Sequence, residues 1–214
     1  MIDCVTLGLV SSLGPEALIA GVDEAGRGSW AGPVGVGVAA MLRGDLEGFL
    51  EEPWVRRHLN DSKTLTPAWR EVLLPQVRKD FSTGFGTASP GECDELGMTA
   101  ALSLAAERAL SQLGVVPDLT ILDGKHDYIS RPGVVTLVKG DSRSVPVAAA
   151  SLVAKVERDA IMREAGARMP AWGFENHKGY GSRAHEAALL ANGLSGVHRR
   201  SWGYVKRLGL DADQ

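Results

Sequence analysis

Four acidic residues of this sequence follow short apolar segments. Asp23 and Glu24 end the segment ALIAGVDE, Asp123 ends LTILD, and Asp141 comes shortly after VVTLV. Each acid taken alone is more often a turn or capping residue. Carboxylates gathered at one place raise each other's pKa, and a divalent cation relieves their repulsion. Because Mg²⁺ and Mn²⁺ prefer oxygen ligands, the four acids together predict a site for two ions, about 3.5–4 Å apart, that performs phosphoryl transfer.

A glycine-rich stretch, AGRGSWAG at residues 25–32, directly follows the first acidic pair. Gly26, Gly28 and Ala31 match the spacing G-x-G-x-x-G/A of dinucleotide-binding loops, which would indicate a nicotinamide-dependent oxidoreductase. Such a loop must open a helix whose N-terminus binds the pyrophosphate. Here the next residues, PVGVGVAAML, alternate valine with glycine, and this period of two predicts a strand. The dinucleotide interpretation is therefore disfavoured.

The elements that position these residues are predicted from hydrophobic period and from helix-end signals. Strands are predicted at residues 17–24, 33–42, 83–88, 119–122 and 134–138. Helices are predicted at residues 98–113, where Gly114 stops the helix, and at residues 147–169. Two more begin at the caps Thr66, followed by Pro67, and Ser182, and we expect Pro75 to kink or end the first. This order predicts an α/β protein with helices packed on a mixed sheet.

The adjacent acids Asp23 and Glu24 pose a geometric constraint. Strand ends at one edge of a sheet are where open α/β folds build their sites. Consecutive side chains of a regular strand, however, face opposite sides of the sheet. Both acids therefore reach one site only if the strand breaks there, or if one of them acts from the rim.

The composition is that of a soluble globular protein, with 44% hydrophobic and 23% charged residues among 214. No apolar run approaches the ~20 residues that span a bilayer, and an acid stands where an export signal needs a basic region. We therefore expect a cytoplasmic protein without membrane contact. Cys4 and Cys93 are expected to be free thiols, with a disulfide as the alternative. Residues 139–207 hold 12 Lys and Arg against 6 Asp and Glu, which suggests an anionic partner or an uneven solvated surface.

Six segments, in order, resemble the motifs of the ribonuclease HII family. GVDEAGRGSWAGPV resembles the opening motif with its acidic pair and Gly-Arg-Gly, and NDSKTLTPAWRE resembles the Asp-Ser-Lys segment. ILDGKHD resembles the strand of the third acid, and VKGDSRSVPVAAASLVAKVERD resembles the segment of the fourth acid and the helix after it. GFENHKGYGSRAH and GVHRRSW resemble the last two motifs. The six segments span residues 21 to about 202, so the resemblance is highly specific.

The resemblance implies a ribonuclease H-like fold, with a mixed five-stranded sheet flanked by helices and a C-terminal helical segment. It implies a single domain over residues 1–214, with a core at about 17–169 and a substrate-binding segment at about 170–207. The implied activity is endonucleolytic cleavage of RNA in RNA/DNA hybrids and incision 5′ of single ribonucleotides in duplex DNA. Two Mn²⁺ or Mg²⁺ ions would serve hydrolysis to 3′-hydroxyl and 5′-phosphate ends. We expect a monomer that binds these nucleic acids and no evident protein partner.

The resemblance also assigns roles to individual residues. The catalytic and metal-binding acids are Asp23, Glu24, Asp123 and Asp141. Gly26, Arg27 and Gly28 match the family's detector of the ribose 2′-hydroxyl, a role that suits glycines because they let the backbone approach a sugar.

Three further positions match substrate-contacting residues of the family. Tyr180 matches a tyrosine that senses the RNA–DNA junction by packing on the neighbouring deoxyribose. Without the motif, core packing would be the favoured role of Tyr180. Lys63 matches a lysine that contacts phosphate, and Lys155 could do the same, with a solvated surface lysine as an equal alternative for both. His177 and His198 also lie in family motifs, but we assign them no role.

The sequence departs from the family pattern at two places. Ser29 and Trp30 are bulkier than expected, and SWGYV at residues 201–205 lacks the usual phenylalanine after the serine. Both departures could alter the grip on substrate. The related ribonuclease HIII is disfavoured because its extra N-terminal domain does not fit in the roughly 17 residues before the first strand. A non-catalytic binder of RNA/DNA hybrids is the alternative of another class, and the intact acid set argues against it.

Overall fold

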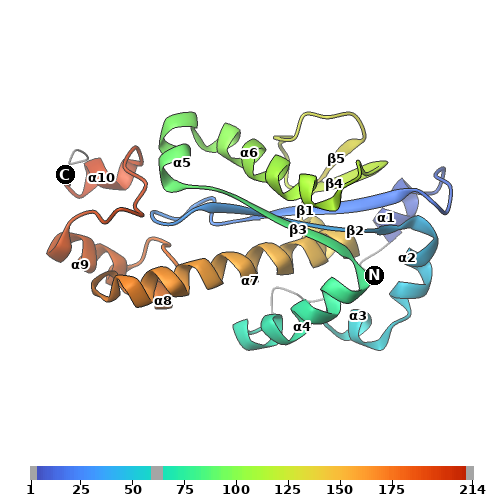
Figure 1. The fold of residues 1–214 in the computed structure, drawn as a ribbon, viewed down its shortest axis with the longest axis horizontal. Helices are drawn as coiled ribbons and strands as arrows, with labels where there is room; N and C mark the ends of the chain where they lie inside the picture. Colours follow the sequence, from blue (N-terminus) through green and yellow to red (C-terminus); the bar gives the residue numbers. More distant parts are fainter. Residues whose placement is uncertain (1–3, 59–64, 211–214) are drawn as a thin grey trace.

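The fold is built on one mixed sheet, in a computed structural model that describes residues 4–58 and 65–210. The five strands lie in the order β3-β2-β1-β4-β5 (Figure 1). β1 pairs antiparallel with β2 and parallel with β4, while β3 adds antiparallel to β2 and β5 adds parallel to β4. The strands are β1 (Leu18–Ala25), β2 (Val34–Leu42), β3 (Ser82–Ala88), β4 (Leu119–Asp123) and β5 (Val134–Leu137). The mixed five-stranded sheet is confirmed, and every predicted strand end lies within one residue of its observed end.

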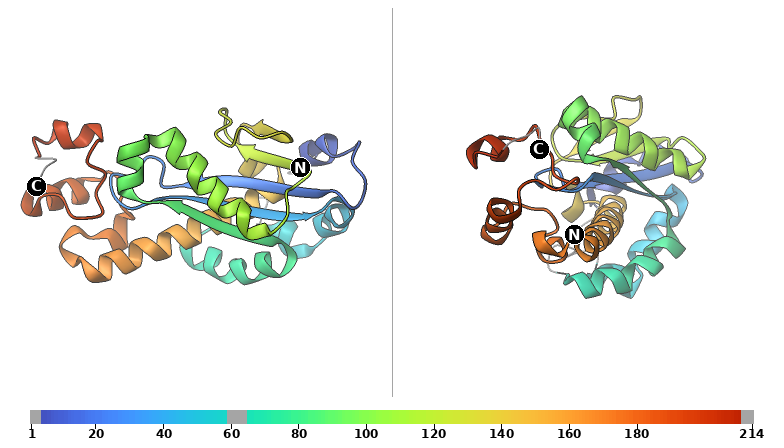
Figure 2. Two further views of the ribbon diagram at one scale, coloured as in Figure 1. Left: turned by 45° about the horizontal axis from the view of Figure 1, so that its top comes forward. Right: turned by 60° about the vertical axis from the view of Figure 1, so that its left-hand side comes forward.

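Helices cover both faces of this sheet. The long helix α7 (Val145–Arg168) lies on one face with α4 (Pro67–Asp80) outside it, and α6 (Met98–Leu110) lies on the other face after α5 (Pro90–Leu96) (Figures 1 and 2). The remaining α-helices are α1 (Cys4–Leu9), α2 (Arg43–Leu50), α3 (Pro53–His58), α8 (Phe174–His177), α9 (Arg183–Asn192) and α10 (Gly203–Arg207). Short 3₁₀ turns are η2 (Ser111–Leu113), η3 (Gly140–Ser142) and η4 (Pro170–Trp172). The C-terminal helices α8, α9 and α10 gather at one end of the molecule.

The valine–glycine alternation of β2 places large side chains on one face of the sheet and none on the other. Val34, Val36 and Val38 are fully buried in the apolar cluster beneath α6. On the other face, a Cβ on Gly37 would lie only 2.3 Å from the carbonyl oxygen of Ala150 in α7. Glycine is therefore required there because α7 packs directly on the backbone of the sheet.

The two predicted helix caps are confirmed. The Thr66 hydroxyl accepts a hydrogen bond from the Trp69 amide at 3.3 Å at the start of α4. The Ser182 hydroxyl accepts one from the His185 amide at 3.1 Å at the start of α9. Each bond satisfies an amide that would otherwise lack an intrahelical partner.

The prediction that Pro75 could end its helix is wrong. α4 continues through Pro75 to Asp80. Leu73, Leu74 and Val77 are buried in the main apolar cluster on either side of the proline. Their burial holds the helix against the core and offsets the backbone hydrogen bond that proline removes.

The other misses are short elements. α1, α2, α3, α5, α8 and α10 were not predicted, because segments of four to eight residues are too short to show a helical period. One of them, α10, follows α9 and buries Tyr204 and Val205 against Leu189. The predicted helix at 98–113 divides into α6 and η2, and Gly114 stops it with a φ of 71°. Among the described residues, no helix combines the length and apolar character that crossing a membrane requires.

Candidate active site

The sheet brings the four predicted acids to one edge. β1, β4 and β5 are parallel, so their C-terminal ends point the same way. Val22 pairs with Leu122, which places Asp23 and Asp123 at the same level of neighbouring strands. Asp141 lies in η3, directly after β5. The expectation that the acids follow strand ends at a common edge is therefore confirmed.

Glu24 reaches this edge without a break in its strand. β1 continues to pair with β2 through Ala25, whereas its pairing with β4 stops at Val22. Asp23 and Glu24 thus lie beyond the part of β1 that pairs with β4. Glu24 lines a pocket there together with Asp141, and this position is the one that the second predicted alternative, action from the rim, requires.

Burial and mutual repulsion make the acidic pair difficult to ionise. Asp23 is only 7% exposed. Burial chiefly raises its pKa to about 8; the charges of Asp123 and Glu24 add to this rise, while hydrogen bonds from Ser151 and the Glu24 amide oppose it. Burial also raises the pKa of Glu24, against the lowering effect of Arg27. A divalent cation would remove the repulsion that these carboxylates feel.

Neighbouring groups bind the acids at this edge of the sheet. The Gly140 amide donates to Asp123 Oδ1 at 2.6 Å and so ties the segment of Asp141 to β4. Arg27 Nη1 lies 3.4 Å from Glu24 Oε1. Within residues 4–58 and 65–210, no three His, Cys, Asp or Glu side chains lie close enough to hold one metal ion. The carboxylate donor set still fits hard divalent cations, and these four acids are the residues that would hold them.

The predicted ribose detector forms a tight turn directly after β1. The Ser29 amide donates to the Gly26 carbonyl at 3.2 Å, which makes Arg27 and Gly28 the central residues of a β-turn. The Tyr180 hydroxyl accepts a hydrogen bond from the Gly26 amide at 3.1 Å. The structure therefore joins the turn to the predicted junction-sensing tyrosine, although the two are 154 residues apart in sequence.

The two glycines of this turn differ in their surroundings. Gly26 has a φ of +83°, and a Cβ there would lie 1.8 Å from Arg158 Nε. This glycine is therefore required by the fold, because a side chain would collide with a buried arginine. Gly28 is exposed, does not have a positive φ, and has no heavy atom within 4 Å of the position of a Cβ.

Two fully buried arginines hold this region from behind. Arg199 donates to the carbonyls of Gly26 at 2.7 Å, Arg27 at 3.0 Å and Gly32 at 3.1 Å. Burial lowers the pKa of Arg199 to about 10, which leaves it charged at neutral pH.

Arg158 makes the corresponding bonds on the other side of the turn. It donates to the carbonyls of Ala31, Pro33 and Lys178 and to the hydroxyl of Ser29. Among the described residues, neither Arg158 nor Arg199 is one of the arginines paired with a carboxylate within 4.0 Å. Both charges are therefore compensated by backbone and hydroxyl dipoles.

A chain of neutral histidines supports Tyr180. His198 Nδ1 accepts from the Ser195 amide at 2.8 Å, so its proton lies on Nε2, which donates to His185 Nε2 at 3.0 Å. His185 Nδ1 then donates to the Tyr180 carbonyl at 3.0 Å. Burial lowers the pKa of His185 to about 4 and that of His198 to about 3. His177 stacks on His185 with ring centroids 4.1 Å apart. The histidines thus position a predicted site residue, a role that their sequence context did not reveal.

The departures at Ser29 and Trp30 pack against other parts of the protein, Ser29 as a buried and Trp30 as a partly buried residue. Ser29 is fully buried, and its hydroxyl donates to the Gly26 carbonyl at 2.8 Å. The Trp30 ring stacks on Tyr204 with centroids 4.8 Å apart. Both residues therefore contact groups that support the turn. Their effect on substrate binding stays a prediction.

The predicted lysines have different outcomes. Lys155 lines the pocket of Glu24 and Asp141, and its Nζ lies 2.7 Å from Asp159 Oδ1 and 5.8 Å from the centroid of the Tyr180 ring. Lys63 lies outside the described residues.

Sequence reasoning missed Ser151, Arg158 and Arg199. A signal existed for Arg158, because it lies four residues from both Ala154 and Met162 on the buried stripe of α7. Arg199 lies within the motif GVHRRSW, but nothing in the sequence indicates that Arg199, rather than the adjacent Arg200, is the buried arginine.

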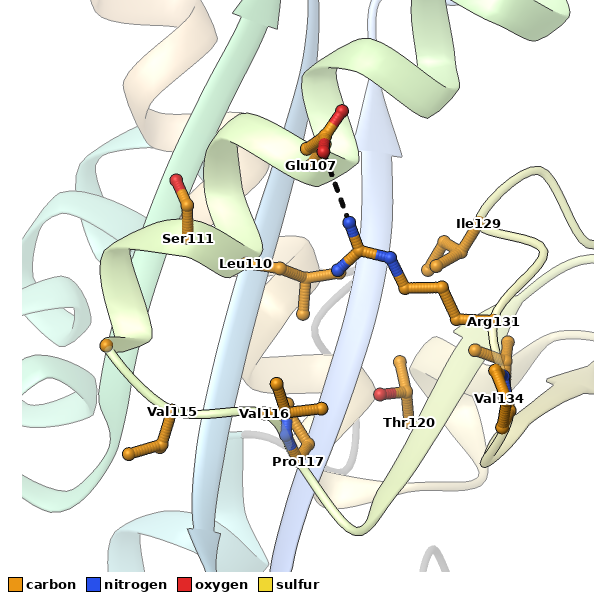
Figure 3. A pocket seen from close by; sticks show the side chains of 12 residues that line it. Glu107, Leu110, Ser111, Val115, Val116, Pro117, Thr120, Ile129, Arg131 and Val134 are labelled. Carbon is orange, nitrogen blue, oxygen red and sulfur yellow. Dashed lines mark hydrogen bonds and ion pairs between the residues drawn. The ribbon is translucent and has the colours of Figure 1, made fainter.

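A second pocket lies away from the acids. It is lined mainly by apolar side chains of the end of α6 and the starts of β4 and β5, among them Leu110, Val116 and Val134 (Figure 3). Arg131 and Glu107 form an ion pair of 3.3 Å across it. It contains none of the predicted site residues, so the site is assigned to the edge that carries the acids.

Comparisons with known proteins cover nearly the whole chain. The family model described as Ribonuclease HII matches residues 20–205. A ribonuclease HII of Streptomyces avermitilis is 50% identical over 194 residues, which cover 89% of this chain and 79% of the relative. A ribonuclease HII of Thermus thermophilus is 43% identical over 197 residues, covering 90% of each.

A solved structure supports the same likeness. The crystal structure of the ribonuclease H2 from Pyrococcus horikoshii OT3 matches with a TM-score of 0.71 and 25% identity, over 89% of this chain and 96% of that one. The expected ribonuclease H-like architecture is therefore confirmed. The residues matched by the family model include the four acids, the Gly-Arg-Gly turn and Tyr180.

Proposed function

Because the chain belongs to the ribonuclease HII family, whose members are metal-dependent endonucleases that cleave the RNA of RNA/DNA hybrids, we propose that it also incises duplex DNA at single embedded ribonucleotides. The cut falls 5′ of the ribonucleotide and leaves 3′-hydroxyl and 5′-phosphate ends. The observation that carries this proposal is a backbone turn with an open glycine directly beside a group of carboxylates.

The carboxylates are proposed to hold two Mg²⁺ or Mn²⁺ ions. When bound, the ions supply an activated water and stabilise the leaving 3′-oxygen in an in-line displacement. The chain's part is to present the oxygens of Asp23, Glu24, Asp123 and Asp141 at one edge of the sheet. The Gly140 amide orients Asp123, and Ser151 orients Asp23. Hydrogen-bond partners of this kind keep metal-binding side chains in position.

The Gly-Arg-Gly turn is proposed to read the ribose. Gly28 offers an exposed backbone with open space where a side chain would be, so a sugar can come into direct contact with it. Tyr180, bonded to the turn and partly exposed, is proposed to pack on the adjoining deoxyribose. Lys63 and Lys155 are proposed phosphate contacts, which would position the duplex without specifying it.

Catalysis is tested with Asp123→Asn on a DNA duplex that contains one ribonucleotide. We expect cleavage in Mg²⁺ or Mn²⁺ to fall by at least about 100-fold, because one ligand charge is lost, while duplex binding persists. The control is Asp45→Asn, which changes an exposed acid on α2. Wild-type protein that binds the duplex but does not cleave it would support the non-catalytic binder instead.

Ribose recognition is tested with Gly28→Ala. Because the added methyl meets no protein atom, we expect an unchanged melting temperature, but at least about tenfold weaker cleavage at a single ribonucleotide because the methyl stands where the sugar binds. The matched control is Gly48→Ala on α2, where the new methyl also meets nothing within 4 Å. Equal activity of the two variants would contradict the assignment of the turn to the ribose.

A further inference from the structure

The buried arginine Arg199 controls the direction of two peptide groups in the Gly-Arg-Gly turn. It donates to the carbonyls of Gly26 and Arg27 from inside the protein. The carbonyl and the amide N–H of a trans peptide group point in opposite directions, and none of the described peptide bonds is cis. Pulling these two carbonyls inward therefore turns the amides of Arg27 and Gly28 outward.

These two amides are available to a ligand. Within the part of the chain that the structure describes, neither the Arg27 amide nor the Gly28 amide donates to a protein acceptor. Both residues are exposed. Successive amides in a turn form a small concave donor site for an oxygen atom.

The charge of Arg199 also strengthens these donors. The Gly26 carbonyl accepts three hydrogen bonds, from the Ser29 amide, the Ser29 hydroxyl and Arg199 Nη2. A carbonyl that accepts from a charged group polarises its peptide, so the opposite amide becomes a better donor. Because Arg199 is fully buried, its effect is not screened by solvent.

Arg158 can be compared with Arg199, because it is also a buried arginine but binds the carbonyls of different peptide groups. It too is fully buried and donates to backbone carbonyls. Behind its Ala31 and Lys178 carbonyls, however, the amides are used internally: Gly32 donates to Val197 and Gly179 donates to His177. Arg158 therefore supports the fold without presenting donors to a ligand.

We propose that Arg199 is a positioning residue for ribose recognition, which aims and strengthens the Arg27 and Gly28 amides as donors to the 2′-oxygen of a ribonucleotide. This inference rests on the proposed function. A phosphate oxygen is the other acceptor that such amides could bind, and the two sources differ in one respect. A phosphate contact would be present in all-DNA duplex as well, whereas a ribose contact would not.

The first test compares Arg199→Lys with Arg168→Lys, which changes an exposed arginine at the end of α7. Dissociation constants are measured by fluorescence anisotropy in EDTA for two duplexes of one sequence, with and without a single ribonucleotide. A lysine keeps the charge but has one nitrogen, so it cannot bridge the three carbonyls. We expect Arg199→Lys to reduce the preference for the ribonucleotide at least about fivefold, and Arg168→Lys to leave that preference within about twofold.

The second test acts on the donor itself and does not depend on a buried substitution. Arg27→Pro removes the amide hydrogen at a turn position that favours proline, and Arg27→Ala removes only the side chain. We expect the proline variant to lose at least about fivefold more ribonucleotide preference than the alanine variant. In the Arg199→Lys background this difference should shrink, because both changes act on the same donor.

Three results would overturn the inference. Equal weakening of both duplexes by Arg199→Lys would assign the amides to phosphate or to structure alone. Additive effects of Arg199→Lys and Arg27→Pro would mean that the arginine does not act through the turn. If Arg199→Lys fails to fold, equal preference of Arg27→Pro and Arg27→Ala decides against the donor role. A wild-type protein without any ribonucleotide preference would overturn the proposed function and this inference together.

Discussion

At the scale of single residues, the site concentrates unfavourable charge. Asp23 is buried beside Glu24 and Asp123, and its pKa is raised to about 8. Arg27 supplies the positive charge next to Glu24 in this arrangement. Such a group is costly to the folded protein alone, but it is suited to divalent cations, which bind carboxylates most strongly when these repel one another.

Replacing Asp23 with asparagine should stabilise the protein without metal. An acid whose pKa is higher in the folded state binds more protons there than in the unfolded chain, so stability falls as pH rises from about 4 to about 8. Asp23→Asn removes this loss of stability. We expect the free energy of unfolding of the variant to exceed that of the wild type by on the order of 2 kcal/mol at pH 8 in EDTA, measured by urea denaturation.

With divalent metal bound, the wild type should become more stable than Asp23→Asn. Saturating Mn²⁺ stabilises the folded wild type through binding, and the variant with one ligand fewer should gain less. Equal stability of Asp23→Asn and wild type in EDTA at pH 8 would contradict the account of Asp23 as a buried, repelled acid.

At the scale of elements, the turn after β1 and the segment around Tyr180 form one unit. The Tyr180 hydroxyl accepts from the Gly26 amide, and its carbonyl accepts from His185. His185 and His198 share a single proton between their facing Nε2 atoms at 3.0 Å. Protonation of the acceptor nitrogen of either ring, His198 Nδ1 or His185 Nε2, would break this pattern, so the unit depends on neutral histidines.

Acid should therefore loosen this unit. The pKa values of His185 and His198 are lowered in the folded state, so the unfolded chain binds more protons below its ordinary histidine pKa near 6.5. We expect stability to fall from about pH 6.5 toward pH 4, with these two rings contributing up to about 1.4 kcal/mol per pH unit each.

The contribution is measured by urea denaturation across this range in the double variant His185→Gln, His198→Gln. Its stability should depend less steeply on pH than that of the wild type. His126→Gln, at an exposed histidine, is the matched control and should keep the wild-type slope. Parallel curves for the double variant and the wild type would contradict the neutral-histidine account.

At the scale of the whole molecule, the C-terminal segment is fastened to the sheet through the β1–β2 loop. The Trp30 and Ala31 amides donate to the Gly179 carbonyl, and the Arg199 amide donates to the Trp30 carbonyl. Arg199 then fills the space behind the turn. The proposed core and the proposed substrate-binding segment therefore share the contacts that form the site.

We expect these two parts to unfold as one. Scanning calorimetry of the full chain should give a single transition whose calorimetric and van't Hoff enthalpies agree. Arg199→Lys should lower that transition as a whole, because the arginine joins both parts. Two resolved transitions, with only the smaller one shifted by Arg199→Lys, would show that the C-terminal segment folds separately.

Much of the fold could be predicted because its signals are local. The five strands and the caps at Thr66 and Ser182 follow from period and residue type over a few positions. The acids could be placed at one edge because parallel strands end on the same side. One local signal was missed: Ser89 and Glu92 form a capping box at the start of α5, and the pattern is present in the sequence.

The sequence by itself thus determined the sheet, the gathering of acids after its strands and the family motifs. Only the tertiary structure decided why Gly26 is glycine, that Ser29 is buried and Trp30 stacks on Tyr204, and that Arg158 and Arg199 are buried on backbone carbonyls. The reason is physical: period and capping depend on neighbours a few residues away. The burial of a charge depends on partners more than a hundred residues away, and these meet only when the chain has folded.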